Sequence, residues 1–225
     1  MSIAGASLIA IWNDVTDEGR ENFYQWHNRE HMPERVGITG FLRGRRWIAI
    51  SGEPEYFTLY EVRDNAVLAG KDYLERLNSP TEWTKRSIKD FLNVARSLCN
   101  VDFSAGKGSG GIMATLRFDC EPEKDAALMK YLKAACEVLI EAPGMVGVHI
   151  CRADISASNV KTEEKKGRPD PLVPRWVILL ESSTPEAVDA ALSGSLSQKA
   201  FAGAGIPNAN PSVYRLENDL VSASR

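Results

Sequence analysis

Two histidines lie four residues apart in the stretch HNREH at positions 27–31, with a glutamate directly before the second. As a pattern this is H-x-x-E-H, in which inverted metalloproteases hold zinc and place a general base. The i, i+4 spacing suits two ligands of one metal on a helix face. Three observations count against a zinc hydrolase. The motif is short, Pro33 places His31 at or near the helix end, and no later helix offers an obvious acidic third ligand.

His31 also has the chemistry of a general acid–base. The helix macrodipole favours a protonated histidine near a helix C-terminus and burial favours a neutral one, so we expect the pKa of His31 near working pH. Tyr60, with Arg45 or Arg46, would then hold an oxygen-bearing substrate. A structural interpretation stays open beside this one. In it, His31 donates to a carbonyl and fixes the turn at Met32-Pro33, while His27 packs under aromatic neighbours.

The elements that must position these side chains follow one order twice along the chain. In the first set, strands are predicted at 7–14, 38–51, 54–62 and 99–103, and helices at 16–37 and at 66–98, the latter split by Pro80. After the glycine-rich stretch 104–111, strands are predicted at 111–119, 145–155, 174–182 and 210–218, and helices at 123–142 and 184–196. Both sets read β-α-β-β-α-β, the ferredoxin-like order. A single α+β domain with coincidental order is the alternative.

The fold class that this order predicts is α+β. It has two fused ferredoxin-like (βαββαβ) halves, 1–104 and 111–225, joined by a linker at 105–110. Their antiparallel sheets would pack as an intrachain α+β barrel. Helices would cover one face of each sheet, leaving a partly apolar face that alternates through Ile9/Ile11 and Tyr56/Thr58/Tyr60. Such a face needs a partner sheet, so we expect a central cavity between the halves and place function there.

The stretch WHNREHMPERVGITGFLRGRRW (26–47), followed by YFTLYEV (56–62), resembles the EthD-like proteins of the dimeric α+β barrel superfamily. Those proteins share a helix with an E-H-x-P-like stretch and a G-F turn into a strand with arginines. The matching residues here are Glu30-His31-Met32-Pro33, Gly40-Phe41 and Arg43/Arg45/Arg46. The close resemblance covers residues 7 to about 100, and the second half is similar in fold pattern only. Because the superfamily includes cofactor-free cyclases, isomerases and dehydratases, quinone-forming monooxygenases and haem enzymes, the resemblance implies a fold and a pocket and leaves the reaction open.

Composition excludes several partner classes. The chain has 225 residues, of which 44% are hydrophobic and 25% charged, as in ordinary globular proteins. A net charge of −3 gives no basic field for nucleic acid, and no apolar run has the length of a membrane span. The N-terminal apolar stretch lacks preceding positive charges, so it predicts a strand and not a signal peptide. The four separated cysteines (Cys99, Cys120, Cys136, Cys151) suggest free thiols, and we expect a cytoplasmic protein.

These features together predict a cofactor-independent lyase, cyclase or isomerase that acts on a small oxygenated or aromatic compound. His31 would be the proton shuttle and Tyr60 the second catalytic residue, with Arg46, Trp47 and Tyr24 binding the substrate. This interpretation needs no cofactor and no metal ligand. The first alternative is a non-catalytic small-molecule binding protein. The second is a haem- or metal-dependent oxidoreductase, for which His149 is a conceivable haem ligand, although a packed histidine is the commoner case. The expected partner is a small molecule, with no nucleic acid and no membrane, and pairing of two chains as a homodimer is left open.

Overall fold

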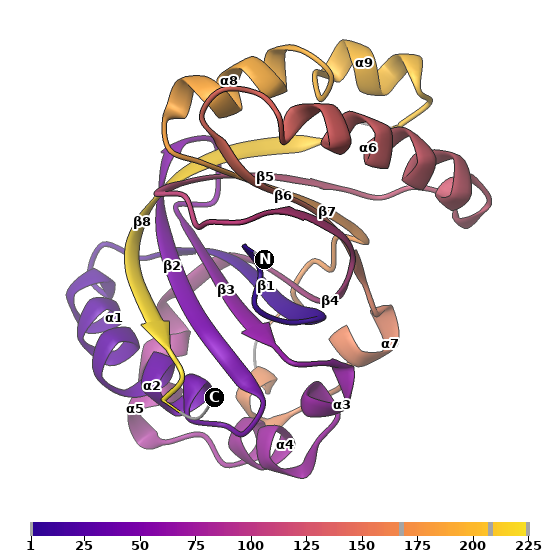
Figure 1. Ribbon diagram of the computed structural model, residues 1–225. Coiled ribbons are helices and arrows are strands. Elements are labelled where there is room, and N and C mark those ends of the chain that lie inside the picture. The colour runs from indigo at the N-terminus through magenta and orange to yellow at the C-terminus, as the bar shows by residue number, and fades with distance from the viewer. Residues whose placement is uncertain (1, 167–168, 207–208, 224–225) are drawn as a thin grey trace.

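The computed structural model describes residues 2–166, 169–206 and 209–223, and its strands close into one antiparallel barrel (Figure 1). Around the barrel the strand order is β1-β3-β2-β8-β5-β7-β6-β4. The strands are β1 (Ser7–Val15), β2 (Phe41–Ser51), β3 (Tyr56–Val62), β4 (Phe91–Gly106), β5 (Ile112–Phe118), β6 (Met145–Ala153), β7 (Trp176–Ser182) and β8 (Asn210–Val221).

Helices cover the outside of the barrel in two groups that lie on opposite sides of it (Figure 1). The first group comprises α1 (Arg20–Trp26), a π-helical turn (His27–His31), α2 (Met32–Val36), α3 (Asn65–Leu68), α4 (Lys71–Asn78), α5 (Glu82–Ser87) and a 3₁₀ turn (Ile88–Asp90). The later helices are α6 (Asp125–Leu139), α7 (Ile155–Ser158), α8 (Pro185–Ser193) and α9 (Gln198–Gly203), with 3₁₀ turns at Pro122–Lys124 and Glu163–Lys165. Within the described ranges, no helix is both long and apolar enough to cross a bilayer.

Two strand pairs close the barrel. Residues up to 106 supply the order β4-β1-β3-β2, and residues from 112 supply β8-β5-β7-β6. β2 then pairs with β8, with Trp47 opposite Leu216, and β4 pairs with β6, with Phe103 opposite Ile150. Every one of these pairings is antiparallel. The α+β class and the antiparallel barrel predicted from the sequence are confirmed.

The barrel interior, where we expected a cavity, holds large side chains. Trp12, Trp47, Phe57 and Tyr214 are fully buried there. Phe57 stacks between two tryptophans, with ring centroids 5.0 Å from Trp12 and 5.3 Å from Trp47. Aromatic burial of this extent contributes strongly to stability, so the interior acts as a core.

We predicted that the sheet face with Ile9 and Tyr60 points into the barrel, and this prediction is wrong. The row that contains Ile9 and Tyr60 packs with Met32 and Val36 of α2, outside the barrel. The alternate row, which includes Trp12, faces inward. Because both rows of β1 are apolar, alternation alone does not say which row is inside.

The boundary of β4 also differs from the prediction. We expected helix through Leu98, whereas β4 begins at Phe91 and pairs with β1, so that Ile9 lies opposite Leu98. The apolar residues of DFLNVARSL also fit helical spacing, and tertiary pairing overrides that signal. At its other end β4 includes Ala105 and Gly106, which pair with β6, although the predicted linker began there.

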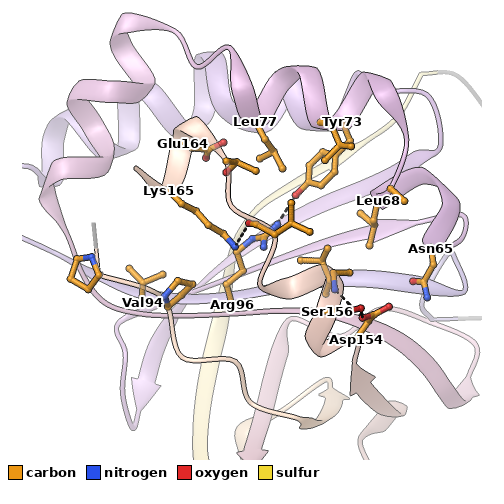
Figure 2. A pocket seen from close by; sticks show the side chains of 18 residues that line it. Asn65, Leu68, Tyr73, Leu77, Val94, Arg96, Asp154, Ser156, Glu164 and Lys165 are labelled. Carbon is orange, nitrogen blue, oxygen red and sulfur yellow. Dashed lines mark hydrogen bonds between the residues drawn. The ribbon is translucent and has the colours of Figure 1, made fainter. Parts of the chain in front are cut away.

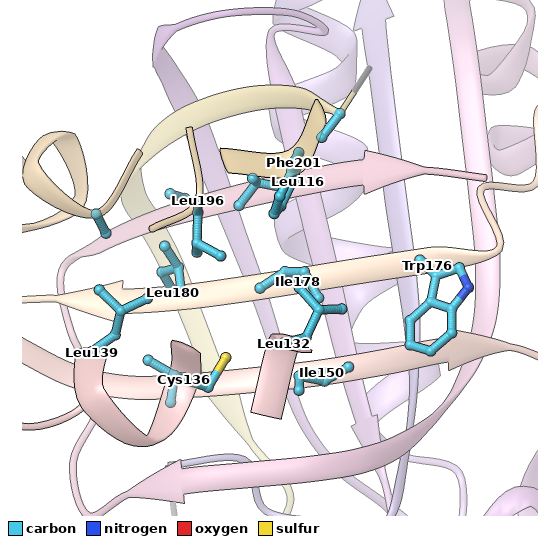
Figure 3. Packing of buried hydrophobic residues seen from close by; sticks show 14 of the residues in the cluster. Leu116, Leu132, Cys136, Leu139, Ile150, Trp176, Ile178, Leu180, Leu196 and Phe201 are labelled. Atoms are coloured by element: carbon cyan, nitrogen blue, oxygen red, sulfur yellow. The ribbon is translucent and has the colours of Figure 1, made fainter. Parts of the chain in front are cut away.

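A second core lies on the outer face of the β5–β8 side, under α6, α8 and α9 (Figure 3). Leu132 and Cys136 of α6 pack there with Ile150 and Ile178 of the sheet. The i, i+4 spacing of Leu128, Leu132 and Cys136 along α6 produces this buried stripe. The core anchors α6, α8 and α9, whereas Ala157 of α7 packs with the cluster under the first group.

Candidate functional site

The HNREH stretch forms a π-helical turn between α1 and α2, and its histidines face the outer surface of the sheet. His27 and His31 are both buried, and their ring centroids lie 5.7 Å apart. His31 packs against Trp26, with ring centroids 4.3 Å apart, and meets Tyr60 edge-on at 6.5 Å. Single π-helical turns inside α-helices are frequent at functional sites.

The neighbours of the two histidines do not suit a zinc site. His27 Nδ1 lies 3.1 Å from an Arg46 guanidinium nitrogen, which can only donate. Glu30, the general base of the zinc interpretation, accepts hydrogen bonds from the hydroxyls of Thr81 and Thr84. Among the described residues, no group of three or more His, Cys, Asp or Glu side chains is arranged to hold a metal ion.

His31 and Tyr60 are brought together as predicted for a catalytic pair, yet both are enclosed by protein. His31 Nδ1 and the Tyr60 hydroxyl are buried and have no hydrogen-bond partner among the described residues. Burial, reinforced by the charges of Arg35 and His27, lowers the pKa of His31 well below its usual value. Burial raises the pKa of Tyr60. His31 is therefore neutral at working pH, and its catalytic role stays a prediction.

The residues predicted to bind substrate lie on two different faces of the sheet. Arg46 is outside, where its guanidinium stacks 4.7 Å from the Tyr24 ring centroid and its Nε donates to Glu217 at 3.1 Å. Trp47 is inside, in the aromatic stack of the barrel core. Arg46, Tyr24 and Trp47 therefore cannot surround one ligand, and each of them already contacts other side chains of the protein.

A charged cluster crosses the barrel interior. Arg45 forms ion pairs with Glu61 at 2.8 Å and with Glu181 at 2.9 Å, and all three side chains are fully buried. Burial raises the pKa of Glu181, but the His149 ring 3.6 Å away and the hydrogen bonds from Arg45 outweigh it and lower that pKa to about 2. His149 has Ser2 Oγ at 2.8 Å from Nε2 and a second serine hydroxyl at 2.9 Å from Nδ1. Because both ring nitrogens are engaged inside the core, His149 does not fit the role of a haem ligand.

A pocket of about 550 Å³ opens outside the barrel, between α4, the outer face of β4 and the connection from β6 to β7 (Figure 2). Mainly apolar side chains form its wall, among them Leu68 and Leu77 from the helices, Val94 and Leu98 from β4, and Pro171 from the connection. Its size and lining are those of small-molecule sites. None of the three histidines lines it, nor does any other site residue predicted from the sequence.

Two cations lie at the polar end of this pocket. Arg96 Nη2 donates to the Tyr73 hydroxyl at 2.7 Å. Lys165 Nζ donates to the carbonyl oxygens of Ser158 and Val160, at 2.7 and 2.9 Å. Burial and the nearby Arg96 guanidinium lower the pKa of Lys165 to about 8. Figure 2 shows the ends of the Arg96 and Lys165 side chains approaching each other across the pocket.

The carboxylates of the pocket wall are engaged with other groups. Asp154 caps the N-terminus of α7, and Glu164 accepts a hydrogen bond from Arg35 at 2.6 Å. In the part of the chain that the structure describes, neither Arg96 nor Lys165 forms an ion pair. The pocket therefore combines apolar walls with two cations that form no ion pair among the described residues, although the Glu164 and Asp170 carboxylates lie near enough to raise the pKa of Lys165. This arrangement favours a ligand with an apolar body and an anionic oxygen.

Sequence reasoning missed these pocket residues. Arg96 fell in a segment predicted as helix, and Lys165 fell in the charged stretch between the strands predicted at 145–155 and 174–182, to which no function was assigned. One signal was present in the sequence. The first β-hairpin turns within four residues, from Ser51 to Tyr56, whereas the corresponding connection in the second set is a long segment with three prolines. Long connections of this kind are often functional.

No family model and no curated protein matches the chain. Solved structures match it in fold. An anthrone oxidase-like protein superposes with a TM-score of 0.67 at 9% identity, over 100% of this chain and 97% of its own. A candidate monooxygenase of Fusobacterium nucleatum superposes with a TM-score of 0.62 at 9% identity, covering 97% and 96%. A candidate monooxygenase of Lactobacillus acidophilus gives 0.60 at 10% identity, covering 96% and 97%.

These likenesses define the class of the fold, a ferredoxin-like α+β barrel, and extend over nearly the whole chain. At such low identity they show the fold alone, because one fold hosts many unrelated chemistries.

Proposed function

We propose that the chain is an enzyme that acts without a cofactor on a small organic anion bound in the pocket between α4, β4 and the β6–β7 connection. The reaction class is proton transfer at carbon, as in a lyase, cyclase or isomerase. Arg96, with Tyr73 beside it, would hold the negative oxygen of the substrate, while the apolar wall would hold its hydrocarbon or aromatic body. The neighbours named as monooxygenases or as anthrone oxidase-like are consistent with small-molecule chemistry on this fold.

One observation carries the proposal: two cations, Arg96 and Lys165, line a largely apolar pocket, and within the described residues neither forms an ion pair with a carboxylate. Placing uncompensated charge in apolar surroundings costs free energy, so a ligand that supplies the opposite charge is stabilised. A planar guanidinium can also bind a carboxylate or an enolate oxygen through two parallel hydrogen bonds. An anion in this position would have its α-carbon within the apolar part of the pocket.

A matched ligand pair tests the binding step. 1-Naphthoate and 1-naphthamide have nearly the same shape and differ in charge. We expect naphthoate to bind about tenfold more tightly by calorimetry, because a hydrogen bond to a charged group contributes roughly 1.5–3 kcal/mol. Arg96→Gln should remove the preference, while Arg86→Gln, on the nearby α5 but outside the pocket wall, should keep it. Equal affinities for both ligands in the unmodified protein would contradict the proposal.

Deuterium uptake tests the catalytic step. Phenylpyruvate carries a carboxylate, an aromatic body and acidic protons at C3. We expect the protein to accelerate exchange of these protons in D₂O, followed by NMR, and Arg96→Gln to reduce the rate by about a hundredfold. If the protons exchange only at the spontaneous rate while naphthoate still binds, the protein binds its ligand without catalysing proton transfer. That alternative is favoured by one observation, that none of the three histidines lines the pocket.

The proposal extends to the architecture. We infer that residues 1–104 are an EthD-like half and that the chain is a fusion of two ferredoxin-like halves, with the repeated β-α-β-β-α-β order as support. In this arrangement the connection from β6 to β7 of the second half completes a pocket on the first. Each half then contributes one of the two cations, Arg96 from the first and Lys165 from the second.

A further inference from the structure

We propose that Lys165 is a catalytic amine that forms a Schiff base with the ketone of an apolar 2-oxo acid. This inference rests on the pocket described above and adds to it a covalent step and a substrate class. It starts from the hydrogen bonds of Lys165. Its Nζ donates to the carbonyl oxygens of Ser158 and Val160, at 2.7 and 2.9 Å.

Partial burial and a neighbouring cation activate Lys165. Two of its N–H groups donate to the Ser158 and Val160 carbonyl oxygens, which both the amine and the ammonium ion can do. Burial and the Arg96 guanidinium disfavour the ammonium ion, whereas the carboxylates of Glu164 and Asp170 favour it, and the pKa falls on balance to about 8. Part of the population is therefore the nucleophilic amine near neutral pH, in the same way that desolvation and a neighbouring cation activate lysines in other enzymes.

The position of Arg96 selects the substrate. With a carboxylate on Arg96, a carbonyl on the adjoining carbon lies on the side of the pocket that Lys165 lines. A 2-oxo acid has this arrangement, with its carboxylate directly bonded to the ketone carbon. The apolar walls formed by residues such as Leu77 and Val94 accept an aromatic or branched side chain.

The covalent step balances without an oxidant or a reductant. The Nζ lone pair forms a bond to the ketone carbon, the C=O π electrons move to oxygen, and nitrogen passes one of its protons to that oxygen to give a neutral carbinolamine. A second proton, from solvent, converts the hydroxyl into water; as the water leaves, the nitrogen lone pair forms the C=N bond of a protonated imine of Lys165. The imine accepts the electron pair of the C3–H bond when the C3 proton passes to water, so it lowers the barrier to the proton transfer proposed above.

Reductive trapping tests the inference. The purified chain is incubated with phenylpyruvate and cyanoborohydride, and the adduct is located by intact mass and peptide mapping. We expect one adduct, on Lys165, forming faster as the pH rises through about 8. Lys165→Arg, which keeps the charge and the donors, should abolish it. Lys166→Arg should keep it, because Lys166 is exposed and pairs with Glu163. 3-Phenylpropanoate, which has no ketone, should slow the labelling by competing for Arg96.

Two results would overturn the inference: labelling spread evenly over the exposed lysines, or an adduct that persists in Lys165→Arg. Naphthoate binding separates this failure from failure of the pocket. If naphthoate binds and no adduct forms on Lys165, the amine chemistry is wrong and the binding site stands. If naphthoate does not bind either, both proposals fall together.

Discussion

Arg45 donates two parallel hydrogen bonds to Glu181, at 2.9 and 3.0 Å, across the interior of the barrel. Arg45 lies on β2 and Glu181 on β7, so the pair joins two strands that are far apart in the sequence. Its Nε also donates to Glu61, at 3.0 Å. Both carboxylates accept a further hydrogen bond from a backbone N–H, Glu61 from Ala4 and Glu181 from Gly110. The cluster thus fixes the N-terminal segment and the β4–β5 connection against the barrel.

Replacing Arg45 by Met should destabilise the protein strongly. The substitution keeps much of the side-chain volume but leaves Glu61 and Glu181 buried without their cation. Breaking a buried ion pair from one side typically costs about 3–5 kcal/mol. Urea unfolding at neutral pH, followed by circular dichroism, measures the loss in the free energy of unfolding.

Arg43→Met is the matched control for that measurement. Arg43 lies two residues earlier on β2 and pairs with Asp219, but its side chain is partly exposed. Exposed ion pairs contribute about 1 kcal/mol or less, so this variant should be nearly as stable as the unmodified chain. If both variants lost the same small amount, the interior cluster would not hold the barrel closed.

The order of the elements could be predicted from the sequence because it depends on local patterns. The strands around Leu8, Phe57 and Ile178 carry strong apolar runs, and α6 has a clear helical stripe. Which row of a strand faces inward could not be predicted, since Ile9 and Leu8 are equally apolar. That choice follows from barrel closure, which is a property of the whole chain.

The candidate site could not be predicted for a related reason. Arg96 and Lys165 are distant in sequence, and only the path of the β6–β7 connection brings them to one pocket. Arg96 acquires its orientation from β4, whose pairing with β1 overrode a helix-like local pattern. The HNREH motif has the residue types and spacing of a zinc-binding pattern, whereas the structure packs His31 against Trp26 and Tyr60.

His31→Phe should make stability less dependent on pH. The pKa of His31 is lowered in the folded state, chiefly by burial, so below pH about 6.5 the unfolded chain binds a proton that the folded chain does not. The stability that depends on neutral His31 is complete above that pH and is lost as the pH falls toward the lowered folded pKa. The loss is about 1.4 kcal/mol per pH unit while only the unfolded state is protonated. Between pH 7 and pH 5, the free energy of unfolding should therefore fall less steeply for the variant than for the unmodified chain, by about 1.4 kcal/mol per pH unit.

The measurement at pH 8 is the internal control for His31→Phe. His31 is neutral in both states there, its Nδ1 has no hydrogen-bond partner within the described part of the chain, and phenylalanine keeps the packing on Trp26. The two proteins should therefore have similar stability at pH 8. Parallel pH curves would contradict the assignment of a lowered pKa. The same variant tests the catalytic role predicted for His31, since undiminished deuterium exchange with phenylpyruvate would remove it from the mechanism.

Glu164→Gln should loosen the wall of the pocket. Glu164 accepts a 2.6 Å hydrogen bond from the buried guanidinium of Arg35, and this pair ties the β6–β7 connection to α2. A hydrogen bond to a charged group contributes roughly 1.5–3 kcal/mol, so its loss should increase local opening by about tenfold or more. Hydrogen exchange of residues 158–166, followed by mass spectrometry, measures that opening.

Glu163→Gln is the control, because Glu163 forms an exposed pair with Lys166 and should leave exchange unchanged. Equal exchange in all three proteins would mean that the Arg35 ion pair does not hold the connection in place. Its contacts with β4 would then do so, since the Leu172 backbone is hydrogen-bonded to the backbone of Val94 and Arg96.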